Sequence, residues 1–83
     1  EFKTLHRIVN NKVEAIEFSI PKATKYTSKA LKDLTIKPNA LIACIIRENK
    51  VIIPSGKDCI EPLDSVVVIT TNTSIKDFSD IMG

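Results

Sequence analysis

The stretch that most constrains the fold runs from Ala40 to Pro54 and reads ALIACIIRENKVIIP. Two apolar runs, 40–46 and 51–53, are separated by four polar residues. The runs are rich in β-branched residues and too short for helices, so they predict a β-hairpin with its corner at Glu48-Asn49. Neither arm alternates apolar with polar residues, as a strand with one face in water does. We therefore expect both faces of the hairpin to be covered, one by the chain and one by something else.

Two other segments have the pattern of strands. Residues 13–20 place Ile16, Phe18 and Ile20 on one face, and Pro21 ends the run. Residues 66–70 are apolar on both faces and follow a turn at Glu61–Asp64 that contains Pro62. With the hairpin, these segments predict a four-stranded, largely antiparallel sheet.

Three segments have the pattern of helices. Ser28 is expected to cap a short helix over 28–34, and Ser74 with Asp77 fits a capping box. The residues behind that box form one helical stripe, Ile75, Phe78, Ile81 and Met82. Residues 1–11 carry apolar side chains at helical spacing, which predicts a helix that either packs on its own domain or connects it to a preceding one.

The predicted order of elements therefore indicates an α+β fold with helices on one face of the sheet. The open face suits a twofold partner, because closed symmetric dimers are the commonest way to bury a self-complementary patch. A chain of 83 residues forms one domain with a modest core.

Composition excludes several classes of function. No apolar run is long enough to span a bilayer, so we expect no direct membrane insertion. A net charge of +2 is too small to indicate binding to nucleic acid or to an anionic membrane. With only two glycines the chain has no dinucleotide fingerprint and no P-loop. His6, Cys44 and Cys59 are scattered at spacings that indicate no metal site and no catalytic pair. Two cysteines could form one disulfide, but Cys44 lies in an apolar strand and Cys59 in a polar loop, so we expect two free thiols in a reducing cytosol. We predict that the chain is not an enzyme.

Two basic features leave alternatives open. Residues 22–37 hold five lysines and a single acid, Asp33, which indicates either an anion-binding patch or a solvated face. Arg47 ends an apolar strand, where it either pairs with a phosphate or carboxylate or lies on the surface beside Glu48.

Residues 13–71 resemble the TrkA C-terminal domain, also called the RCK C-terminal domain. Four pieces carry the resemblance: VEAIEF at 13–18, SKALKDL at 28–34, LIACIIR at 41–47 with VIIPSG at 51–56, and EPLDSVVV at 61–68. Their combination and order are specific, although no single piece is. Two positions depart from the family pattern, since Leu63 and Asn49 stand where the family usually or often has glycine.

The resemblance implies a dimerising regulatory domain on the cytoplasmic side of the membrane, similar to the peripheral subunit of Trk-type potassium uptake systems. Residues 1–11 would then be a linker helix from a missing upstream domain, and 12–83 the regulatory domain. NAD or ATP would bind only in that upstream domain, and the full-length protein would contact the membrane subunit of the transporter. The alternatives are a purely structural dimerisation domain and the same domain attached to a cation/proton antiporter.

Some members of the family bind cyclic di-AMP in the groove between two such domains, which is lined by the central hairpin strand. For this chain we expect any nucleotide to be anionic and to lie on the twofold axis of a homodimer. The expected ligand contacts are Leu41, Ile42, Ala43, Arg47, Lys50, Ile53 and Pro54, and the expected dimer contacts are Ile45, Ile46 and Val51.

Overall fold

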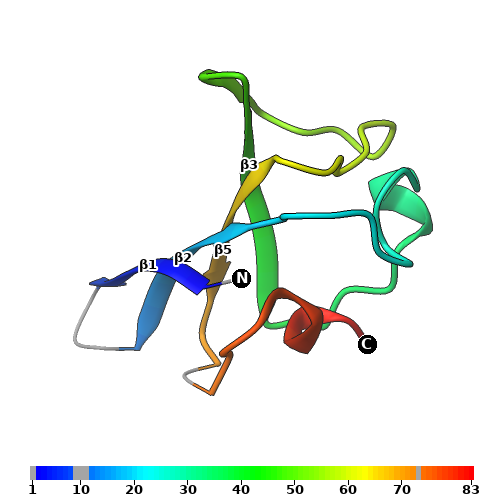
Figure 1. Ribbon diagram of the computed structural model, residues 1–83. Coiled ribbons are helices and arrows are strands. Elements are labelled where there is room, and N and C mark those ends of the chain that lie inside the picture. Colours follow the sequence, from blue (N-terminus) through cyan, green and yellow to red (C-terminus); the bar gives the residue numbers. More distant parts are fainter. Residues whose placement is uncertain (1, 9–11, 73) are drawn as a thin grey trace.

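The computed structural model describes residues 2–8, 12–72 and 74–83. Within them the chain forms one antiparallel sheet with strand order β1-β2-β5-β3-β4. Figure 1 shows the strands crossing the middle of the molecule and the long β2–β3 connection to their right. The elements are β1 (Phe2–Ile8), β2 (Val13–Ser19), β3 (Ala40–Arg47), β4 (Lys50–Ile52) and β5 (Ser65–Thr70), with the 3₁₀ helices η1 (Leu31–Asp33) and η2 (Phe78–Ile81).

The two central strands β2 and β5 alternate strictly between a buried and a half-buried face. Ile16 pairs with Val68 and Phe18 with Val66, and all four side chains are fully buried. This period of two is what a sheet with its core on one face requires. The predicted core face of Ile16, Phe18 and Ile20 is confirmed.

Strand β3 contains a β-bulge that its apolar sequence conceals. The register against β5 shifts between Ile42 and Cys44, so Ala43 is the extra residue. A bulge changes which side chains share a face. Ile42 and Ile45 therefore both point into the core although they are three residues apart, and Cys44 and Ile46 face the other way.

The corner of the β3–β4 hairpin is the predicted Glu48-Asn49 pair. Both residues have positive φ, 52° and 65°. Positive φ at both central residues is the signature of a type I′ turn, whose twist matches that of the flanking strands. The position of the corner is confirmed.

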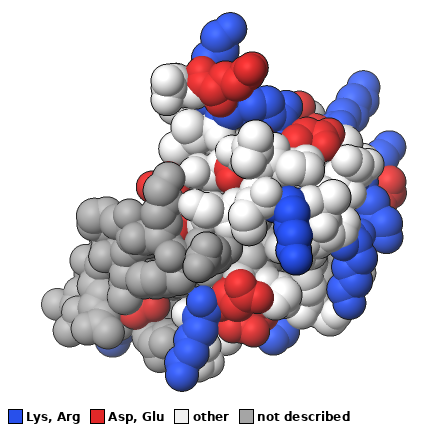
Figure 2. Space-filling model, viewed as in Figure 1, with Lys and Arg blue, Asp and Glu red and all other residues white. Residues whose placement is uncertain are grey.

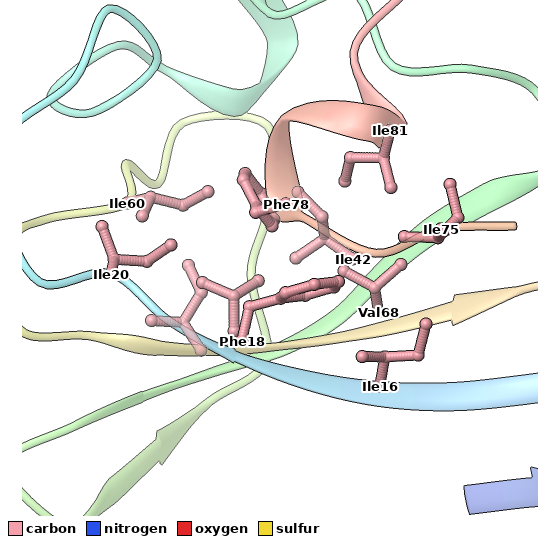
Figure 3. Packing of buried hydrophobic residues seen from close by; sticks show 11 residues of the cluster. Ile16, Phe18, Ile20, Ile42, Ile60, Val68, Ile75, Phe78 and Ile81 are labelled. Carbon is pink, nitrogen blue, oxygen red and sulfur yellow. The ribbon is translucent and has the colours of Figure 1, made fainter. Parts of the chain in front are cut away.

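The core is a single cluster on one face of the sheet (Figure 3). Phe78 from η2 packs edge-on against Phe18 from β2, with ring centroids 5.7 Å apart, and the ring centroids of Tyr26 and Phe78 are 5.0 Å apart. Ile75 and Ile81 are also buried, so the predicted C-terminal apolar stripe is confirmed as core.

The sequence predicts a helix over residues 1–11, and this prediction is wrong for the residues that the structure describes. Phe2–Ile8 instead forms the edge strand β1. The backbone pairs with β2 in the register Leu5 to Ile16, with an irregularity between Phe2 and Thr4. Because of this irregularity Phe2 and Leu5, three residues apart, pair with Phe18 and Ile16, two residues apart, and their spacing imitates that of a helix. Residues 1 and 9–11 lie outside the described part, and a linker to an upstream domain stays a prediction.

The two other predicted helices are shorter than expected. Ser28 does not cap η1: it has φ 63°, and its hydroxyl donates to Glu61. The N–H groups of Leu31 and Lys32 instead donate to carbonyls of the loop at 56–58, so the segment is held by long-range bonds. At η2 the capping box joins Asp77 with Asp80, one turn after the predicted Ser74 with Asp77.

Leu63 is strained in the turn that precedes β5. The Asp64 N–H donates to the Glu61 carbonyl at 3.2 Å, and Leu63 has φ 75°, which with Pro62 before it defines a type II turn. This φ favours glycine, and the Leu63 side chain is 84% exposed.

We expect Leu63→Gly to raise the free energy of unfolding by about 0.5–1 kcal/mol. Relief of left-handed strain of about 1–2 kcal/mol exceeds the extra entropy that glycine loses on folding, about 0.5–1 kcal/mol. Urea unfolding measures the change. Leu63→Ala is the control, because it keeps the Cβ atom; an equal gain from alanine would refute strain as the cause.

Candidate functional site on the central hairpin

The face of the sheet opposite the core, which we call the outer face, carries apolar side chains from four strands. Ala15, Ile69 and Leu41 follow one another across β2, β5 and β3. Ile46 and Val51 form a second row across β3 and β4. Leu41 is 63% and Val51 65% exposed, whereas the core face is closed. The chain therefore covers one face of the hairpin and leaves apolar side chains of the other exposed.

Two hollows lie beside Leu41, at the start of β3. One, of about 470 Å³, is lined by Leu41 together with Pro38–Ala40 and Ile69–Thr71. The other, of about 330 Å³, brings together three of the predicted ligand contacts, Leu41, Ile42 and Pro54. Lys37 supplies a positive charge at the second hollow. Both hollows are lined mainly by apolar side chains, which suits the flat face of a base or a partner side chain.

Arg47, at the far end of β3, is held by the chain itself. Its Nε and Nη2 donate to the two carboxylate oxygens of Asp64 at 2.9 and 2.8 Å, and Nη2 also donates to the Cys59 carbonyl at 2.9 Å. Such a bidentate pair is among the strongest side-chain interactions. We call this group the Arg47–Asp64 clamp. It ties the hairpin to the turn before β5.

Asp64 in the clamp is buried, 2% exposed. Burial favours its neutral form, but hydrogen bonds from Arg47 and from the Glu61 N–H outweigh that effect and hold the pKa of Asp64 below its ordinary value of 3.8. The hydrogen bond to Asp64 raises the pKa of Arg47. Both groups are therefore charged at neutral pH.

The predicted ligand contacts lie in two groups at opposite ends of the hairpin. Leu41, Ile42 and Pro54 meet at the second hollow, whereas Arg47 and Lys50 lie at the other end of the hairpin. The rise of a strand separates the ends of β3 by about 20 Å. Neither Arg47 nor Lys50 lines either of the two hollows beside Leu41.

The remaining predicted ligand and dimer contacts differ in how far their side chains are exposed. Ala43 is half-buried at the bulge, and Ile53 is 77% exposed just after β4. Ile46 and Val51 lie on the outer face as a dimer contact requires. Ile45 does not, because its side chain is fully buried in the core of its own chain. That correction follows from the bulge, which turns Ile45 inward.

The cysteines and the potential metal ligands form no further site in the part of the chain that the structure describes. Cys44 and Cys59 are free and half-buried. No group of three or more potential metal ligands occurs among the described residues. None of the described helices is long and apolar enough to cross a bilayer.

Most of the chain matches a known domain family. Residues 15–83 match the model of the TrkA-C domain. The chain belongs to the TrkA-C domain family. This match begins within β2, continues to the end of the chain and leaves β1 outside it.

Curated relatives are archaeal proteins whose names refer to potassium uptake. Over 72 residues, 87% of this chain, it is 32% identical to "Trk system potassium uptake protein trkA homolog 1" and 29% identical to "homolog 2", both of Methanosarcina mazei. The identity to "Trk system potassium uptake protein TrkA homolog" of Archaeoglobus fulgidus is 31% over the same length. The matched region is 18%, 16% and 16% of those proteins, so this chain spans less than a fifth of each.

Proposed function

We propose that this TrkA-C domain is a cytoplasmic regulatory domain of a potassium uptake system and dimerises through the outer face of its central hairpin. Membership of the family and the names of the relatives support the class of function. The observation that carries the proposal is the exposure of Leu41 and Val51 on that face. Exposed apolar side chains grouped on one face are typical of interaction sites.

A twofold axis perpendicular to β3 makes the two copies of this strand antiparallel. The Leu41 end of one copy then lies beside the Arg47 end of the other. The second hollow of each copy would thus gain a positively charged neighbour from its partner, and every contact would occur twice. This arrangement reunites the two groups of predicted contacts that lie apart within a single chain.

The ligand that fits such a groove is an anionic dinucleotide with twofold symmetry, such as cyclic di-AMP. Leu41 and Pro54 offer apolar surface to the bases at the second hollow, whereas the predicted contact Ile42 has its side chain in the core of its own chain. The Arg47 side chain is 36% exposed, and its clamp to Asp64 uses Nε and Nη2, so Nη1 retains two donors for a phosphate. A hydrogen bond to a charged group contributes about 1.5–3 kcal/mol. Ala43, Lys50 and Ile53 complete the proposed set of contacts.

The larger assembly follows from the same proposal. The whole protein would lie at the inner face of the membrane and bind the transporter's membrane subunit, and NAD or ATP would bind in an upstream domain. A purely structural dimer without a ligand is the second candidate, which the position of Arg47 in the clamp favours. Attachment of the domain to a cation/proton antiporter is the third.

Calorimetry with cyclic di-AMP tests the ligand. We expect binding by the wild type and loss of binding by Leu41→Glu, because the new carboxylate repels the phosphates at an exposed position where the fold tolerates it. Leu63→Ala, which alters an exposed leucine in another loop, serves as the control and should bind like the wild type. Binding unchanged by Leu41→Glu would refute the site. No binding by the wild type at ~100 μM, about −5.5 kcal/mol, would leave the structural dimer as the function.

A further inference from the structure

The connection between β2 and β3 carries a concentration of positive charge, of which only Lys37 lines a hollow of the proposed site. Its five lysines, which we call the lysine face, are all exposed, and Figure 2 shows basic side chains gathered on the right, where Figure 1 places this connection. None of the five forms a salt bridge in the described part of the chain. The members are Lys22, Lys25, Lys29, Lys32 and Lys37.

Neighbouring acids are engaged in hydrogen bonds within the fold. Glu61 accepts from the Ser28 hydroxyl at 2.8 Å, and Asp58 accepts from the Ser55 N–H at 2.6 Å. Asp33 is exposed and is the one acid of the segment. The whole chain has a net charge of only +2, so the lysine face is more basic than the rest of the molecule.

A hollow of about 240 Å³ opens within the lysine face. Lys25 and Lys29 line it together with Tyr26, Asp33, Leu34, Thr35, Met82 and Gly83. Lysine ammonium groups are hydrated point charges that attract phosphate without requiring a fixed geometry, unlike the planar fork of arginine. The hollow therefore holds two phosphate-attracting cations and one carboxylate, that of Asp33, beside the apolar side chains of Leu34 and Met82.

We propose that the lysine face docks this domain on an anionic phospholipid surface. This inference rests on the proposed function, because a potassium uptake system works at a membrane. In a polybasic segment each lysine near an anionic lipid surface contributes independently to the binding free energy. Each lysine therefore multiplies the affinity for the lipid about five-fold. No shape complementarity is required, which agrees with lysines spread along a connection rather than gathered around one deep pocket.

An exposed apolar side chain beside the lysine face favours a membrane over an acidic protein segment. The Leu63 N–H donates to the Ile20 carbonyl at 2.6 Å, so Leu63 lies next to the start of the lysine-rich connection. Its side chain is 84% exposed. Surfaces that bind the membrane interface combine lysines with apolar side chains at their edge.

Vesicle sedimentation with the 83-residue chain tests the proposal. We expect the chain to partition onto vesicles of phosphatidylcholine mixed with phosphatidylglycerol, and not onto phosphatidylcholine alone. Raising the salt towards 1 M, where the Debye length is about 3 Å, should release it. Lys25→Gln with Lys29→Gln should weaken the partition about thirty-fold, and Lys29→Gln alone about five-fold.

The matched control is Lys12→Gln, which removes one charge from an exposed position before β2 and should change the partition less than two-fold. An equal loss from Lys12→Gln and Lys29→Gln would overturn the proposal, because net charge alone would then explain binding. Absence of binding to the anionic vesicles at low salt would also overturn it. Binding to polyglutamate but not to vesicles would assign the lysine face to an acidic protein instead.

The result of the vesicle experiment does not depend on the results of the dimer and ligand tests. Vesicle binding is measured without nucleotide, and the lysine variants leave the outer face unchanged. A chain that binds anionic vesicles but no cyclic di-AMP would retain the docking surface while losing the proposed ligand.

Discussion

Replacing Arg47 with alanine is expected to lower the free energy of unfolding by about 2–3 kcal/mol. Asp64 is buried, and without Arg47 its carboxylate loses two hydrogen bonds at 2.9 and 2.8 Å. Removing one partner of a buried pair costs about 3–5 kcal/mol, and we reduce this value because the Arg47 side chain is 36% exposed and partly solvated. For a domain of this size that is a large part of the total stability.

Urea unfolding at neutral pH measures the change, and Lys50→Ala at the hairpin corner is the control, expected within about 0.5 kcal/mol of the wild type. A loss below 1 kcal/mol for Arg47→Ala would show that the clamp is not structural.

The same clamp predicts a dependence on pH. The pKa of Asp64 is lower in the folded than in the unfolded chain. The unfolded chain therefore binds the proton first as pH falls, and stability decreases from about pH 4 downward, through the folded-state pKa. Above that range the contribution is fully present. Arg47→Ala should make this acid-induced loss smaller, which urea unfolding at pH 3 and pH 7 would measure.

A charge at Ile45 is expected to abolish folding, whereas a charge at Val51 is not. Ile45 is fully buried in the core, and Val51 is 65% exposed on the outer face. An unpaired carboxylate in an apolar core costs several kcal/mol, which approaches the stability of a small domain. Circular dichroism and urea unfolding of Ile45→Asp and Val51→Asp should therefore show one unfolded and one folded chain. Folded Ile45→Asp would contradict the inward orientation that the β-bulge gives this residue.

The elements that were predicted correctly are those with a local signal. The two-residue period of β2, the polar corner of the hairpin and the apolar stripe before the C-terminus each lie within a short window of sequence. Family resemblance added the class of domain, which the match over residues 15–83 confirms.

The features that sequence did not reveal depend on long-range pairing. The bulge at Ala43 lies in an unbroken apolar run, where either face is equally compatible with the residues. The clamp joins residues 17 positions apart, so the sequence left open whether Arg47 pairs with a phosphate or carboxylate or lies on the surface beside Glu48. Strand β1 exists through its pairing with β2, and seven residues are too few to distinguish a strand with an irregular register from a helix.

Dimerisation through the outer face is the central claim, and sedimentation equilibrium at micromolar concentration tests it most directly. We expect the wild type to sediment at twice the mass of one chain and Val51→Glu, which remains folded, to sediment as a monomer. Lys12→Glu, an equal introduction of a carboxylate at an exposed position away from the hairpin, should remain a dimer. A wild type that is monomeric throughout this range, or a Val51→Glu variant that still dimerises, would contradict the assignment of the outer face as the interface.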